Sequence, residues 1–297
     1  MKNTKLLTVI IFSLLVSCAY AGGAGSAAGG FLKLGVGAKA AALGDAMTAA
    51  ASGVEAVYWN PAGVAGIKEG EAAFSHTLWA VETAHTSAGF AMPLGEKSAL
   101  GVLVNYFSAG TMEKIDNTGL AVGTFTASDL SAAVCYSTKF GENLPVGISL
   151  KYISGTIDNS TGSAFAADLG LKYEFSHDFS LAAAVLNLGT KLKYSLLEES
   201  LPMNIKAGIL FRVAGVALSA DISSPSDAAF GWSAGGEYLL NLGGASVALR
   251  GGYNTNTTAG GLCAGAGVSL GGFCLDYAMI MFGDLGNNQR FSVKFKL

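Results

Sequence analysis

The chain has 297 residues and a net charge of -3, is 51% hydrophobic, and contains 41 glycines but only 13% charged residues. Ordinary soluble domains have about 25% charged residues, so this chain has too little charge to cover a surface exposed to water. The slightly negative net charge gives no electrostatic basis for nucleic-acid binding, and no nucleic-acid partner is expected.

The N-terminus has the features of an export signal. Lys2 and Lys5 precede an apolar core over residues 6–16, and residues 19–21 form a small-x-small cleavage site. Together they predict a secretory signal peptide over residues 1–21. The four residues that end at Cys18 also resemble a bacterial lipobox, in which Cys18 would be acylated instead of removed.

Three further cysteines, Cys135, Cys263 and Cys274, lie inside strand patterns. Their number is odd and their spacing is not that of a metal site, so they are interpreted as small residues facing a crowded lumen. No metal and no cofactor are predicted.

Residues 22–69 do not follow a strand pattern. Small residues cluster over 37–42 and 46–52, and Pro61 stands where a helix would begin, which predicts short helices and turns. Residues 35–40 also match a loose G-x-G-x-x-A dinucleotide fingerprint. A nucleotide fold needs repeated strand-helix-strand units after that motif, and the rest of the chain has almost no helical pattern.

From Glu71 onward, apolar side chains alternate with small or polar ones in segments of about the length that a tilted strand needs to cross a bilayer. The last segment illustrates the pattern: Phe291 and Val293 fall on one face, and Arg290 and Ser292 on the other. Fourteen strands are predicted, over residues 71–80, 85–93, 98–107, 125–140, 145–154, 163–175, 179–188, 203–213, 215–223, 229–240, 245–254, 260–270, 273–282 and 290–297.

Two architectures could produce this alternation. A soluble β-sandwich turns its apolar face inward, whereas a membrane barrel turns it to lipid. The other face of these strands is mostly glycine, alanine and serine, which suits a crowded lumen better than bulk water. The sequence therefore predicts an all-β fold, a transmembrane antiparallel up-and-down β-barrel of about fourteen strands over residues 70–297, in contact with outer-membrane lipid.

The connections between strands alternate in length, as they do between the periplasmic turns and external loops of outer-membrane barrels. With an even strand count, both termini are expected in the periplasm. The tight connections are 93–97, 140–145, 175–178, 213–215, 241–244 and 271–272, and the longer ones are 108–124, 154–162, 189–202, 254–260 and 283–289. The connection at 224–228 is the exception, because it should be external and is short.

Scattered charges occur on the non-apolar face of the strands. We expect them to pair with one another and with residues 22–69, because an unpaired charge in a confined space is costly; direct ligand binding is the alternative. They are Lys151, Asp168, Lys172, Lys206, Asp221, Glu237, Arg250 and Asp276.

The sequence offers no catalytic arrangement. His76, His85 and His177 are far apart, and neither a G-x-S-x-G elbow nor an H-E-x-x-H pair is present. The chain is not expected to be an enzyme.

Four stretches carry a resemblance to a known family: residues 34–46, residues 57–63 with the sequence Val-Tyr-Trp-Asn-Pro-Ala-Gly, residues 276–278 and residues 282–286. They resemble the PorV/PorQ family, relatives of the FadL-type long-chain fatty acid transporters. The chain departs from the usual outer-membrane pattern by ending in Leu297 instead of an aromatic residue.

The resemblance implies a fourteen-stranded barrel whose N-terminal hatch, residues 22–69, lies in the lumen. Asn60, Pro61, Ala62 and Gly63 would anchor the base of the hatch, with Asn60 bonded to a lumen group and Pro61 stiffening the turn. A purely structural plug that does not gate is the alternative for these four residues.

Two functions follow from the resemblance. The first is a passive uptake channel for hydrophobic small molecules in the bacterial outer membrane. The alternative is a secretion-associated scaffold that binds an exported protein through external loops, chiefly 108–124 and 189–202.

Overall fold

The computed structural model describes residues 27–79, 83–194, 197–256, 261–281 and 286–297. The predicted signal peptide, Cys18 and most of the 282–286 motif lie outside the described residues. None of the described helices is long and apolar enough to cross a membrane.

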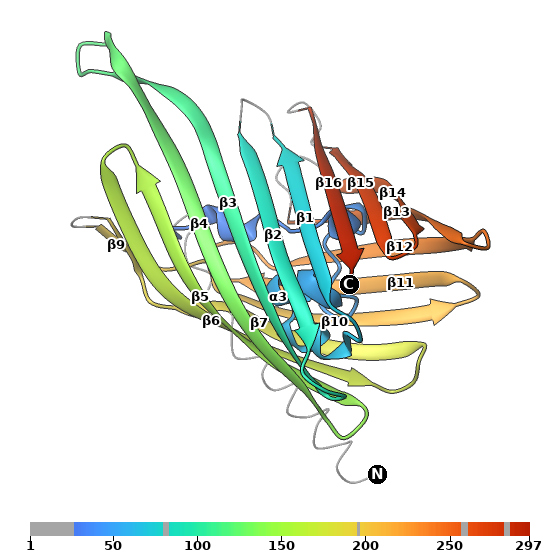
Figure 1. Cartoon of the computed structure of the whole chain (residues 1–297). Helices are drawn as coiled ribbons and strands as arrows, with labels where there is room; N and C mark the ends of the chain where they lie inside the picture. Colours follow the sequence, from blue (N-terminus) through green and yellow to red (C-terminus); the bar gives the residue numbers. More distant parts are fainter. Residues whose placement is uncertain (1–26, 80–82, 195–196, 257–260, 282–285) are drawn as a thin grey trace.

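The described strands form one sixteen-stranded sheet, and all of them except β8 and β9 make up a closed antiparallel barrel (Figure 1). Neighbouring strands in the chain pair in order, β16 pairs with β1, and β5 pairs with β6 to complete the ring. The predicted fourteen-stranded barrel is confirmed. Its strands are β1 (Glu71–Leu78), β2 (Ala84–Pro93), β3 (Ser98–Ile115), β4 (Ala121–Phe140), β5 (Leu144–Ile157), β6 (Ser160–Glu174), β7 (Phe179–Gly189), β10 (Asn204–Val213), β11 (Val216–Pro225), β12 (Gly231–Asn241), β13 (Ala245–Asn254), β14 (Leu262–Leu270), β15 (Phe273–Met281) and β16 (Asn287–Lys296).

The strands present most of their bulky apolar side chains outward. Val134 of β4 and Leu150 of β5 are paired in register, and their side chains are 57% and 62% exposed. The next pair along these strands, Cys135 and Ser149, points inward and is fully buried. Because strand side chains alternate between faces, a slip of one residue would turn the large apolar groups into the lumen. The outward face is therefore the lipid face.

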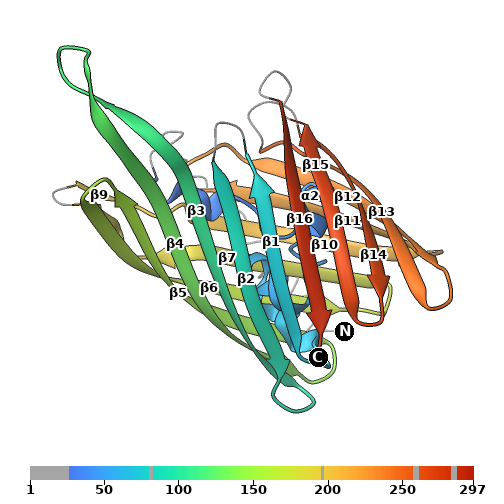
Figure 2. The same ribbon diagram turned by 45° about the horizontal axis from the view of Figure 1, so that its top comes forward.

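Several connections differ from their expected form. The expected loops 108–124 and 154–162 are largely strand: β3 and β4 continue as a long hairpin, and β5 and β6 meet at a tight turn after Ile157. Figures 1 and 2 show the β3–β4 hairpin projecting beyond the other strands. The expected loop 189–202 contains the short strands β8 (Leu192–Tyr194) and β9 (Leu197–Glu199). Backbone pairing between these strands continues beyond the residues whose side chains alternate between apolar and small or polar. The alternation alone therefore underestimates the length of these strands.

We call the end of the barrel that carries the β3–β4 hairpin tip the hairpin end, and the end with the short turns at 94–97 and 141–143 the turn end. The described N-terminal residues 27–69, here called the plug, lie inside the barrel (Figure 2). They form η1 (Gly30–Lys33), α2 (Ala38–Ala42), η2 (Gly53–Glu55), α3 (Ala56–Trp59) and η3 (Pro61–Gly66).

Small residues allow the plug to pack directly on the barrel wall. A side-chain carbon at Gly147 would overlap the backbone of Pro61, and one at Gly252 would overlap the backbone at Leu43. On the plug side, Ala38 and Ala42 are completely buried. The glycine-rich inward face is thus a contact surface for the plug.

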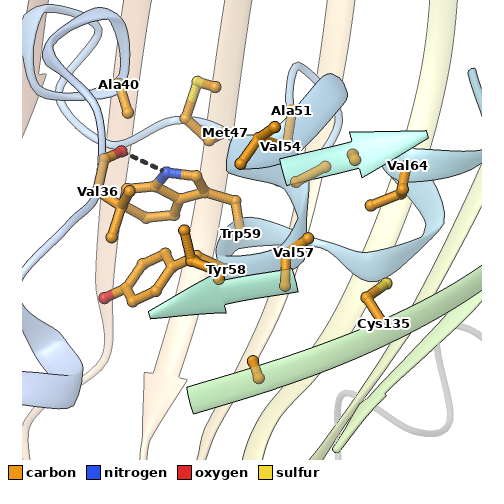
Figure 3. Packing of buried hydrophobic residues seen from close by; sticks show 14 of the residues in the cluster. Val36, Ala40, Met47, Ala51, Val54, Val57, Tyr58, Trp59, Val64 and Cys135 are labelled. Atoms are coloured by element: carbon orange, nitrogen blue, oxygen red, sulfur yellow. Dashed lines mark hydrogen bonds between the residues drawn. The ribbon is translucent and has the colours of Figure 1, made fainter. Parts of the chain in front are cut away.

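The plug also has an apolar core of its own (Figure 3). Val36, Met47 and Val57 surround the indole of Trp59, whose Nε1 donates a hydrogen bond to the Val36 carbonyl oxygen at 2.9 Å. Wall residue Cys135 packs at the edge of this cluster. These contacts join segments of the plug that have little regular secondary structure.

Candidate functional site

The Asn60 to Gly63 segment lies against the wall of β4, β5 and β6. The Asn60 side chain accepts a hydrogen bond from the Ala62 backbone N–H at 3.1 Å and so caps η3, in which Pro61 is the first residue. The hydroxyl of Ser137 on β4 donates to the Ala62 carbonyl oxygen at 3.2 Å. At Gly63 a side chain would overlap the carbonyl of Ala51. All four residues are therefore held closely within the lumen.

The wall charges near the plug occur in ion pairs. Lys151 of β5 lies 2.6 Å from Asp168 of β6. The Asp168 carboxylate also accepts from the backbone N–H of Asn187 at 2.7 Å, and the Lys151 ammonium donates to the Asn187 side chain at 2.8 Å. These contacts account for the charges at this part of the wall.

A second group connects β10 and β11 with the plug. Lys206 lies 3.2 Å from Asp221, and the same carboxylate accepts hydrogen bonds from the backbone N–H and the hydroxyl of Thr48 in the plug, at 2.9 and 2.6 Å. The Lys206 ammonium also lies 4.9 Å from the centre of the Trp59 ring, within the range of a cation–π contact. A wall ion pair therefore holds two segments of the plug.

Arg250 is the centre of a third group. It lies 2.6 Å from Glu237 on the neighbouring strand and 2.6 Å from Asp276, which it reaches across β14 at Gly267, where a side chain would overlap both groups. Glu237 in turn pairs with Lys39 of the plug at 3.0 Å. This network joins three wall strands to α2.

Lys172 stands apart from these groups. Its ion-pair partner is Glu174, at 3.4 Å, on the same strand. Both residues line an open hollow of about 620 Å³ at the turn end, together with Arg212. The structure therefore distributes the eight wall charges over several levels of the lumen and does not gather them in one ligand site.

The inward face of β16 is also bound to the plug. The Ser292 hydroxyl accepts from the Ala38 backbone N–H at 2.6 Å, and Lys294 lies 3.5 Å from Glu55. Arg290 donates to the Gly37 carbonyl oxygen at 3.4 Å. The polar face of β16 is therefore a contact surface for the plug.

A cavity of about 620 Å³ lies between the plug and the wall toward the hairpin end. Its apolar lining comes from both parts of the chain and includes Leu34 and Trp59 of the plug and Leu186 and Ile280 of the wall. Residues that follow β11 and β13, among them Phe230 and Asn256, line it at the hairpin end. It is a candidate binding site for a hydrophobic molecule.

Four charged residues that line this cavity were not assigned a role from the sequence: Lys33, Asp45, Asp227 and Arg290. The alternation placed Arg290 on the inward face. Asp45 lies in a stretch used for the family resemblance, but nothing in its neighbourhood marked it as part of a cavity. The position of Arg290, a charged residue on the inward face of a strand that surrounds the plug, was the one signal in the sequence that could have pointed to this cavity.

No protein-family model matches the sequence, and no curated protein matches it. Solved structures do resemble the fold. The Pseudomonas putida toluene transporter TodX matches with a TM-score of 0.65 and 11% identity, over 88% of this chain and 96% of that chain. The chain has a FadL-type barrel fold.

Two other structures agree with this result. The monoaromatic hydrocarbon channel CymD matches with a TM-score of 0.64 and 13% identity, over 89% of this chain and 98% of that chain. A Pseudomonas aeruginosa FadL homologue matches with a TM-score of 0.58 and 10% identity, over 87% and 97%. At such low identity the likeness shows the fold alone.

Proposed function

We propose that the chain is a FadL-like outer-membrane barrel that takes up hydrophobic small molecules passively. The observation that carries the proposal is the cavity between plug and wall at the hairpin end, which Leu34, Trp59 and Ile280 line in part. The fold likeness to the toluene transporter TodX and the hydrocarbon channel CymD supports it. Transport of this kind requires no catalytic group.

In this proposal residues 1–21 are a signal peptide, residues 22–69 are a hatch, and residues 70–297 are the barrel. The hairpin end faces the outside of the cell, and the turn end, with both termini, faces the periplasm. The ligand enters the cavity from the hairpin end. The plug must then shift, because its contacts with Gly147, Gly252 and β16 fill the lumen below the cavity.

The test is a substitution that places a large side chain in the cavity at a position where it does not clash with neighbouring atoms. Gly30 lines the cavity, and a side-chain carbon there would meet no atom within 4 Å. We expect Gly30→Trp to reduce the uptake of radiolabelled toluene by whole cells toward the level of cells that lack the protein.

Gly66→Trp is the matched control, because Gly66 has the same open surroundings and is not among the residues that line the cavity. Heat-modified gel mobility would verify that both variants form a barrel. Wild-type uptake by a folded Gly30→Trp variant would refute the proposal.

The PorV/PorQ resemblance supports a second candidate, a scaffold that binds an exported protein. The β3–β4 hairpin carries exposed apolar side chains near its tip, Ile115 and Leu120, with 61% and 66% of their surface accessible. Replacing residues 112–124 with a short turn should then abolish partner capture while the barrel still assembles. Unchanged capture would count against the scaffold.

A further inference from the structure

Most charges around the cavity are already neutralised by a neighbour. Lys33 of the plug pairs with Asp227 at 2.7 Å, and Lys206 pairs with Asp221 at 3.2 Å. Two charged residues in the lining differ from these, Asp45 of the plug and Arg290 of β16.

Arg290 is only 2% exposed, yet its hydrogen bonds go to neutral groups. Its Nε atom donates to the hydroxyl of Thr77 at 2.8 Å and its Nη1 atom to the Gly37 carbonyl oxygen at 3.4 Å. A guanidinium has five N–H donors, so these two bonds leave others unused. Among the described residues, no carboxylate forms a direct ion pair with Arg290.

In the part of the chain that the structure describes, Asp45 lacks a hydrogen-bond donor for one of its carboxylate oxygens, just as Arg290 lacks acceptors for some of its N–H groups. Its Oδ1 atom is buried and has no hydrogen-bond partner among the described residues. The atom lies over Gly35, where a side-chain carbon would come within 2.8 Å of it. Burial raises the pKa of the Asp45 carboxyl, and the positive charge of Arg290 partly opposes this effect. The cavity lining thus has a buried acceptor without a partner and a buried donor that is only partly satisfied, as far as the described residues are concerned.

We infer that the cavity recognises a neutral hydrophobic molecule that carries a hydroxyl group, an alcohol or a phenol, through Asp45 and Arg290. A hydroxyl can donate one hydrogen bond, to the Asp45 carboxylate, and accept another, from the Arg290 guanidinium. The apolar body of the ligand packs on Trp59, Leu186 and Ile280. The inference rests on the proposed function, since it names the ligand class of the same cavity.

The charge balance distinguishes this class from two others. A carboxylate could accept from Arg290, but it could not donate to Asp45 and would be repelled by it. A pure hydrocarbon would leave both buried groups without a partner, which is unfavourable. The hydroxyl compound satisfies both groups and adds no charge.

The test compares three ligands with the same ethylphenyl body and a different para substituent, 4-ethylphenol, 4-ethyltoluene and 4-ethylbenzoate. Binding to the purified full-length barrel in lipid nanodiscs is measured by equilibrium dialysis at pH 8, with empty nanodiscs to subtract partition into lipid. At this pH a phenol is still neutral. We expect 4-ethylphenol to bind about tenfold more tightly than either of the others, the usual effect of a hydrogen bond to a charged group.

The decisive variant is Asp45→Asn. Asp45 has a left-handed backbone with φ 63°, which asparagine tolerates, so the local fold should be kept. The variant removes the negative charge of Asp45, which opposes that of Arg290, and puts an amide that can donate a hydrogen bond in its place. We therefore expect the preference to change, with 4-ethylbenzoate binding about tenfold more tightly than in the wild type. A misfolded protein would lose binding and would not gain a new preference.

Asp158→Asn is the matched control, because Asp158 is also left-handed, with φ 53°, but lies in the exposed β5–β6 turn. It should bind all three ligands as the wild type does. Equal binding of 4-ethylphenol and 4-ethyltoluene by the wild type, or an unchanged preference in Asp45→Asn, would overturn the inference and leave the uptake proposal standing. Absence of binding by all three ligands would overturn both.

Discussion

The Asn60 side chain donates a hydrogen bond from Nδ2 to the carbonyl oxygen of Thr48 at 2.7 Å. The same side chain caps η3 through Ala62, and it is only 1% exposed. One amide therefore connects two segments of the plug that are separated by α3.

Replacing Asn60 should loosen the plug. Asn60→Asp keeps an acceptor for the Ala62 N–H but loses the donor and places a carboxylate beside the Thr48 carbonyl. We expect Asn60→Asp and Asn60→Ala each to lower the free energy of unfolding by about 1–3 kcal/mol. Urea unfolding of the barrel in lipid vesicles measures this change. Asn117→Ala, in the exposed tip of the β3–β4 hairpin, should have almost no effect.

Gly147 tests the close approach of plug and wall. Gly147→Ala would bring its side-chain carbon into the backbone of Pro61, so the plug must move or the strand must distort. We expect a loss of about 1–3 kcal/mol in stability, as for other overpacked sites. Leakage of small ions through the variant in a planar bilayer should increase. Gly251→Ala should change neither measurement, because the nearest atom to its added carbon lies 3.9 Å away.

Leu150 tests the lipid face. A lysine there would enter hydrocarbon, at a cost of about 2–4 kcal/mol if it lies near the bilayer midplane. We expect Leu150→Lys to fold more slowly into vesicles and to unfold at lower urea concentration, whereas Leu150→Phe should resemble the wild type. Equal stability of the lysine variant would mean that this face does not contact lipid.

Arg250 tests the wall network. Its removal leaves Glu237 and Asp276 without their shared partner, and breaking a buried pair in this way typically costs about 3–5 kcal/mol. We expect Arg250→Met to be strongly destabilised in urea unfolding. The triple variant Arg250→Met, Glu237→Gln, Asp276→Asn removes the orphaned charges and should recover much of the loss; no recovery would mean that packing, not charge, dominates.

Asp45 predicts a pH dependence. Burial raises the pKa of its carboxyl above the ordinary value of 3.8, so the folded state holds the proton more tightly than the unfolded state does. The resulting stabilisation is fully present below pH 3.8 and is lost as the pH rises through the folded-state pKa, by about 1.4 kcal/mol per pH unit within that window.

The measurement is the unfolding free energy of the wild type minus that of Asp45→Asn from pH 3 to pH 8. We expect the difference to fall with increasing pH and then to become constant. A difference independent of pH would show that the carboxyl has the same pKa in both states.

The barrel could be predicted from the sequence because lipid exposure repeats every second residue along each strand. Leu150 and Val134 are apolar and Ser149 and Cys135 are small, so the alternation alone assigns the outward and inward faces. The same reasoning could not find the full length of β3 and β4. Beyond the membrane their hairpin needs only backbone pairing, which places no alternating requirement on side chains.

The plug motif can also be recognised in the sequence, but its hydrogen-bond partners cannot. The sequence indicated that Asn60 would bond within the lumen, whereas the choice of the Thr48 and Leu171 carbonyls depends on where the plug meets the wall. The pairing of Lys39 with Glu237 likewise joins residues far apart in the chain.

By itself, the sequence determined the number of strands, the face that meets lipid and the small-residue face that admits a plug, because these are local properties of alternating side chains. Only the tertiary structure decided that Asp45 and Arg290 border one cavity. That relationship arises when the ring closes around residues 27–69, and it depends on the register of β16 and the path of the plug, which no local pattern records.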